Sequence, residues 1–106
     1  MFGFSKKEDI NKGIDEFKAT SGAVLLDVRT KEEYLSGHVP GSTNIDVAEI
    51  EKVVSLVGDK ATPLFVHCLS GARSNRAVSA LKSMGYTRVK NIGGISSYSG
   101  RVEKGI

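Results

Sequence analysis

Cysteine is nearly absent from this chain, because Cys68 is the only one among 106 residues. A single cysteine excludes an internal disulfide, a Cys-x-x-Cys redox pair and the cysteine cage of a structural zinc site. We therefore predict no metal site and no cofactor. Long apolar runs are also missing: none approaches the roughly 20 residues of a membrane helix, and residues 1–7 lack the apolar core of a signal peptide. These absences favour a cytoplasmic protein without membrane contact.

Charge of one sign is not concentrated in any segment. The chain has 15 Lys and Arg against 12 Asp and Glu, which leaves a net charge of +3. Because basic and acidic residues are interspersed, no basic patch for nucleic acid is predicted. The content of 40% hydrophobic and 25% charged residues is typical of a globular protein. At this length the chain has room for one core, so we interpret residues 1–106 as a single domain, of open oligomeric state.

Strand-like segments alternate with segments of helical periodicity along the chain. Apolar runs predict buried strands at residues 23–28 and 64–67, and we interpret residues 43–46, after a turn, and residues 87–90, after Gly85, as two further short strands. The periodic segments predict helices from a capping box at Ser5 to about residue 19, from a second capping box at Thr30 to Gly37, over 47–58, and from about Arg73 to Gly85. Such alternation indicates right-handed crossovers and a mainly parallel sheet with helices on both faces, which is a three-layer α/β fold.

The segment 68–74, with the sequence CLSGARS, joins a predicted buried strand to a helix. That position places it at the carboxyl edge of the sheet, where open α/β folds bind ligands. The small residues Ser70, Gly71 and Ala72 let the backbone curl so that successive N–H groups converge above the Cys68 sulfur as an anion cradle. The positive end of the following helix, and Arg73 if it folds back, would favour the thiolate.

A lone cysteine is most often a small buried hydrophobic residue. Cys68, however, stands at a strand-to-helix switch and precedes a loop of small residues, and this context favours a nucleophile.

Several motifs together resemble a known family. Asp27-Val28-Arg29 is followed by Tyr34 and by the turn His38-Val39-Pro40-Gly41, and the pairs Gly85-Tyr86 and Gly93-Gly94 come later. With the loop CLSGARS, they resemble the rhodanese homology domain, and the chain is similar to single-domain thiosulfate sulfurtransferases over nearly its whole length. The resemblance implies a three-layer α/β/α fold with a mainly parallel five-stranded sheet.

The resemblance also implies a double-displacement mechanism. Cys68 would take a sulfane sulfur from a small anionic donor such as thiosulfate and hold it as a persulfide. An acceptor would then remove it: cyanide in vitro, or a thiol or a protein in the cell. The loop residues that would bind the substrate are Leu69, Ser70, Gly71, Ala72 and Arg73.

Supporting rather than chemical roles are implied for Asp27, Arg29 and Ser74. The alternative for Asp27 and Arg29 is a simple surface ion pair. We interpret His38 as fixing the backbone of its turn, and His67 as structural, because alternation along a strand points its side chain away from that of Cys68. Two positions depart from the family pattern: Ser42 stands where alanine is usual, and the region of Ser97 and Tyr98, where tryptophan is common, has none.

Two other functions remain open. His67-Cys68 and Arg73-Ser74 are similar to the ends of the cysteine-phosphatase signature, but only four residues separate Cys68 from Arg73, whereas a phosphatase needs five to wrap a phosphate. A non-catalytic sulfur-carrier or binding module would keep the fold and the cysteine but turn over poorly. An arsenate reductase that needs a second, resolving cysteine is excluded by the cysteine count.

Overall fold

The computed structural model describes residues 9–106. Its helices are α1 (Ile10–Lys18), α2 (Lys31–Ser36), α3 (Val53–Leu56) and α4 (Ala72–Ser83), with short 3₁₀ helices η1 (Val47–Lys52) and η2 (Ile95–Ser97). Its strands are β1 (Val24–Asp27), β2 (Ser42–Asn44), β3 (Leu64–Cys68) and β4 (Val89–Gly94). Strands and helices therefore alternate in the order that the sequence predicts.

The four strands form one parallel sheet in the order β2-β1-β3-β4. The prediction of five strands is wrong for the described residues. Each observed strand overlaps one of the four segments predicted as strands, whereas the fifth strand rested on the family resemblance and had no segment of its own within residues 9–106.

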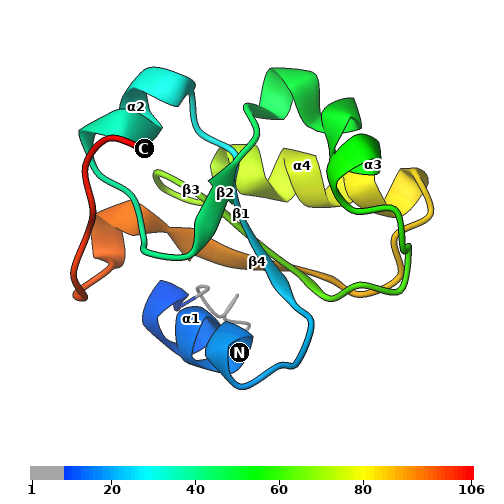
Figure 1. Ribbon diagram of the computed structural model, residues 1–106, viewed down its shortest axis with the longest axis horizontal. Helices are drawn as coiled ribbons and strands as arrows, with labels where there is room; N and C mark the ends of the chain where they lie inside the picture. The colour runs from blue at the N-terminus through cyan, green and yellow to red at the C-terminus, as the bar shows by residue number, and fades with distance from the viewer. Residues whose placement is uncertain (1–8) are drawn as a thin grey trace, which may run out of the picture.

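Alternate residues of the central strands pack into two different cores. Leu26 and Val66 face a cluster with α3 and α4, while Leu25 and Phe65 face a cluster with α1. Figure 1 shows α1 on one side of the sheet and α3 and α4 on the other. The molecule therefore has the three-layer α/β/α arrangement. Because the sheet is parallel, β1 and β3 end at the same edge, at Asp27 and Cys68.

The ends of three elements differ from those predicted. The capping box at Ser5 lies outside the described residues, and α1 begins after Asp9, whose carboxylate accepts the backbone N–H of Asn11 at 3.0 Å. The single helix predicted over 47–58 is split into η1 and α3, with non-helical dihedrals at Glu49. The last strand continues to Gly94 because two glycines, poor strand formers alone, pair there with β3.

The second predicted capping box is present at the start of α2. The Thr30 side chain accepts the Glu33 backbone N–H at 3.2 Å, and the Glu33 carboxylate accepts the Thr30 N–H at 2.9 Å. Local sequence thus determines where this helix begins. In the part of the chain from residue 9 onward, every helix is too short or too polar to cross a membrane.

Candidate active site

The segment after β3 turns sharply into α4. Gly71 is the N-terminal cap of α4 and has a φ of 106°, which favours glycine because a side chain would be strained there. A Cβ at Gly94, on the neighbouring strand, would overlap the backbone of Leu69 and Ser70. The loop is therefore packed directly against β4, and the close approach depends on the Gly93-Gly94 pair.

The sulfur of Cys68 lies under this turn. The residue is 1% exposed, its Sγ accepts the backbone N–H of Gly71 at 3.0 Å, and its Sγ lies 3.5 Å from the Oγ of Ser74. Burial raises the pKa of the Cys68 thiol, but the hydrogen bond with the Ser74 side chain and those from the backbone N–H groups of Ser74, Gly71 and Ser70 lower it by more. The net pKa is below that of an ordinary thiol, so the loop favours the thiolate.

Asn91, which sequence reasoning missed, holds this arrangement from β4. Its Oδ1 lies 2.8 Å from the Ser74 Oγ and accepts the Gly93 N–H at 2.9 Å, and its Nδ2 donates to the Gly71 carbonyl at 3.2 Å. The pairing of β3 with β4 shifts by one residue just after Asn91, so that His67 is opposite Gly93. Nothing in the local sequence signals this irregularity, because it depends on the partner strand.

Arg73 points to α2 rather than to the sulfur. Its two terminal nitrogens donate to the two carboxylate oxygens of Glu33 at 2.7 and 3.0 Å. The hydrogen bond from Arg73 is the main reason that the pKa of Glu33 is lowered to about 2, and bonds from Thr30 contribute. The pair is therefore charged throughout the physiological pH range. Sequence analysis did not identify Glu33, since 40 positions separate it from Arg73.

Asp27 and Arg29 form a buried ion pair rather than a surface one. The Arg29 guanidinium contacts the Asp27 carboxylate at 2.7 Å, and the side chains are 5% and 0% exposed. Arg29 also donates to the Gly37 carbonyl at 2.8 Å, so the pair fixes the chain after α2. The Asp27 carboxylate also lies near the residue before the cysteine, because the Nε2 of His67 is 3.9 Å from its Oδ2.

Neither histidine lies at the sulfur. His67 is fully buried on the α1 side of the sheet, with its Nδ1 3.3 Å from the Cys68 carbonyl, and burial lowers its pKa. His38 stacks on Tyr34 with ring centroids 3.8 Å apart, and its Nδ1 lies 2.9 Å from the Tyr34 carbonyl. These positions agree with structural roles for both residues.

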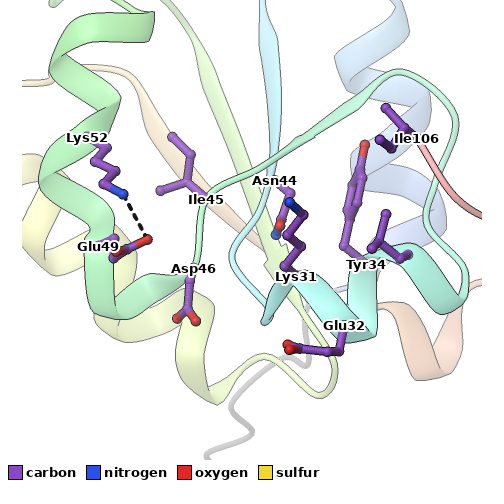
Figure 2. A pocket seen from close by; sticks show the side chains of 10 residues that line it. Lys31, Glu32, Tyr34, Asn44, Ile45, Asp46, Glu49, Lys52 and Ile106 are labelled. Carbon is purple, nitrogen blue, oxygen red and sulfur yellow. Dashed lines mark ion pairs between the residues drawn. The ribbon is translucent and has the colours of Figure 1, made fainter.

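Two hollows flank the region. A polar cavity of about 220 Å³ lies on the β4 side and is lined by Ser70, Gly71, Asn91, Gly93, Gly94, Ser96 and Ser97. A larger cavity of about 510 Å³ lies between α2 and η1, as Figure 2 shows. Its lining combines the apolar side chains of Tyr34, Ile45 and others with five charged side chains, namely Lys31, Glu32, Asp46, Glu49 and Lys52. The smaller cavity is therefore lined directly by the loop, whereas the lining of the larger one contains no residue of the segment 68–74.

The site can perform nucleophilic chemistry at sulfur. It combines a thiol of lowered pKa with backbone N–H groups and a helix N-terminus directed at the same atom. Among residues 9–106, no group of three His, Cys, Asp or Glu side chains is close enough to hold a metal ion. Leu69, at the tip of the loop, is 44% exposed and marks the face that is open to solvent.

Comparison with known proteins gives a consistent answer. The model of the rhodanese-like domain matches residues 7–101. The chain is 41% identical over 71 residues to the thiosulfate sulfurtransferase PspE of Escherichia coli, covering 66% of this chain and 68% of PspE. It is 34% identical over 98 residues, 92% of this chain, to the adenylyltransferase and sulfurtransferase uba4 of Ogataea parapolymorpha, but spans only 25% of that longer protein.

Solved structures agree with this result. A rhodanese with anions from E. coli superimposes with a TM-score of 0.73 and 37% identity, over 78% of this chain and 99% of that one. A thiosulfate sulfurtransferase from Pseudomonas aeruginosa superimposes with a TM-score of 0.79 at 24% identity, which supports the fold alone. With its parallel sheet, its single cysteine in a strand-to-helix loop and a family match over most of its length, this chain belongs to the rhodanese-like sulfurtransferase family.

Proposed function

We propose that this protein is a thiosulfate sulfurtransferase that carries sulfane sulfur as a persulfide on Cys68. The proposal rests on the surroundings of Cys68: its Sγ lies 3.0 Å from the Gly71 backbone nitrogen at the start of α4, and the pKa of its thiol is lowered. Its donor would be thiosulfate or a similar small anion, and its acceptor a thiol or protein, or cyanide in vitro. We also propose that residues 1–106 act as one domain; a cytoplasmic location stays a prediction of the sequence.

The reaction proceeds in two displacements. The Cys68 thiolate attacks the outer sulfur of thiosulfate, the S–S bond breaks, and sulfite leaves with the electron pair. The product, Cys–S–S⁻, has its negative charge on the outer sulfur, where the N–H groups of the loop can stabilise it. Cyanide or a thiolate then attacks that outer sulfur and restores the Cys68 thiolate. Neither the displacement on thiosulfate by Cys68 nor the displacement by cyanide needs a proton, an oxidant or a cofactor.

Intact-mass spectrometry tests this proposal directly. After incubation with thiosulfate and desalting, the protein should gain the mass of one sulfur atom, lose it to cyanide, and form thiocyanate over many cycles. Cys68→Ala should gain nothing. Full thiocyanate production by Cys68→Ala would show that the nucleophile is elsewhere.

The two alternatives give different results in the same assay. A phosphatase would hydrolyse p-nitrophenyl phosphate; we expect no hydrolysis, because the loop has only four residues before Arg73 and that guanidinium is bound to Glu33. A sulfur-carrier module would gain sulfur once but would not produce thiocyanate catalytically. The loading assay and the turnover assay together distinguish all three functions.

A further inference from the structure

Arg73 is the charged side chain of the cysteine loop, and its charge is already balanced. Both of its terminal nitrogens are bound to Glu33, and the two side chains are 29% and 30% exposed. A guanidinium that binds a carboxylate through both terminal nitrogens has few N–H groups left to bind another anion. The residue that sequence analysis assigned to the binding of small anions is therefore held by an anion of the protein.

Glu33 cannot easily release Arg73, because α2 holds the carboxylate in place. Its Oε1 accepts the Thr30 backbone N–H at 2.9 Å and the Thr30 hydroxyl at 3.1 Å. Those bonds are the capping box that starts the helix, so a rotation of Glu33 away from Arg73 would also break the cap. The ion pair is thus a built-in part of the fold.

The linings of the two cavities described above carry no net positive charge. On the α2 side, the larger cavity is lined by three carboxylates and two ammonium groups, and one of the latter, Lys52, is bound to Glu49 at 3.1 Å (Figure 2). Asp46 in this lining is near enough to add to the negative potential at Arg73. On the β4 side, the smaller cavity is lined by serines, glycines and Asn91 without a charged side chain.

We propose that Glu33 is a specificity-determining residue, which neutralises and positions Arg73 so that the loop favours singly charged sulfane-sulfur donors over doubly charged thiosulfate. This inference rests on the proposed function. The natural donor class would be a persulfide monoanion, R–S–S⁻, whose outer sulfur is transferred to the Cys68 thiolate while R–S⁻ leaves. Coulomb energy scales with the charge of the donor. An Arg73 that is not paired with a carboxylate would therefore attract a dianion with twice the energy with which it attracts a monoanion.

Glu33→Gln tests the proposal with little risk to folding, because glutamine at this position keeps the capping box. The donors are thiosulfate, with two charges, and methanethiosulfonate, with one, both read out by sulfite or sulfinate release and by intact mass. Freeing Arg73 should raise kcat/KM, mainly through KM, about tenfold for thiosulfate and about threefold for methanethiosulfonate.

Two comparisons identify the cause of the change. Glu51→Gln removes the same charge from an exposed position of η1 that lines neither cavity, and it should change either kcat/KM less than about twofold. In the Arg73→Ala background, Glu33→Gln should lose its effect on the ratio of the two donors. A purely structural role of Glu33 would lower both rates together and leave that ratio unchanged.

The outcomes separate the two levels of the proposal. If the wild-type protein takes sulfur from neither donor, the proposed function fails. The donor ratio is kcat/KM for thiosulfate divided by kcat/KM for methanethiosulfonate. If the wild type takes up sulfur but Glu33→Gln leaves this ratio unchanged or lowers it, the inference about Glu33 is wrong. A measurement without variants provides a further check: salt should change the wild-type donor ratio less than about twofold, since a neutral site is little affected by screening.

Discussion

The two sides of the cysteine loop differ in how they act on the sulfur. On the inner side, the Gly71 N–H, Ser74 and Asn91 form a network in which Ser74 is fully buried and the partners are uncharged. On the outer side, Arg73 and Glu33 form an ion pair that is about one third exposed. The inner side contacts the sulfur directly, whereas the outer side acts through charge over a distance.

This difference indicates a division of tasks. Hydrogen bonds to a charged atom in a buried site are short-ranged and strong, so the inner side controls whether Cys68 is a thiolate. Charges near solvent are screened and change the free energy of an approaching ion only modestly. Under the proposed function, the outer side would adjust which donor binds without changing the state of the thiol. Substitutions on the inner side should therefore have larger effects than substitutions on the outer side.

Ser74→Ala should have the largest effect, because it removes the hydroxyl 3.5 Å from the sulfur. A hydrogen bond to a charged group contributes about 1.5–3 kcal/mol, which corresponds to a loss of roughly tenfold to a hundredfold in sulfur uptake at neutral pH. The pKa of Cys68 should rise, measured as the midpoint of the pH profile of alkylation by iodoacetamide. Ser74→Thr keeps the hydroxyl and should keep the lower midpoint; an unchanged midpoint in Ser74→Ala would contradict the assignment.

Asn91→Ala should have a smaller effect on the sulfur, because Asn91 is one contact further away. It leaves the Gly93 N–H without the side-chain acceptor that it now has at 2.9 Å, and it removes one donor from the Gly71 carbonyl, which keeps the Asn75 backbone N–H at 3.1 Å. An unsatisfied buried group costs about 1–3 kcal/mol, so urea denaturation should show a lower free energy of unfolding. The rate of sulfur uptake should fall less than in Ser74→Ala. A loss of stability with an unchanged alkylation profile would confine Asn91 to a purely structural role.

The smallest effect concerns the outer side and depends on pH. Because the pKa of Glu33 is lowered from 4.5 to about 2 in the folded protein, its contribution to stability is present above pH 4.5 and is lost as the pH falls towards 2. Solvent screening limits this contribution to less than about 1 kcal/mol.

Thermal unfolding of the wild type and of Glu33→Gln measures this contribution. The two melting temperatures should differ slightly at pH 7 and converge near pH 2, where Glu33 is becoming protonated in the folded protein. A difference that is independent of pH would show that the ionised carboxylate is not what stabilises the pair.

Local patterns were sufficient for much of the fold and for the position of the nucleophile. Apolar runs placed the two central strands, β1 and β3, the capping box at Thr30 placed the start of α2, and the strand-loop-helix order placed Cys68 at the carboxyl edge of the sheet. These features depend on neighbours within a few residues, so the sequence contains them directly. The length of the loop before Arg73 is also a property of the sequence alone.

Only the tertiary structure decided the partners of these residues. Asn91 reaches Ser74 because β4 lies beside β3 with a shifted register, and Glu33 reaches Arg73 because α2 follows a different strand to the same edge. The buried Asp27–Arg29 pair is local in sequence, yet its burial depends on the packing around it. Hydrogen bonds and ion pairs between distant segments are set by packing geometry rather than by local pattern. For this protein, the sequence therefore determined where the proposed nucleophile lies, and the folded structure decided which hydrogen-bonding and charged groups surround it.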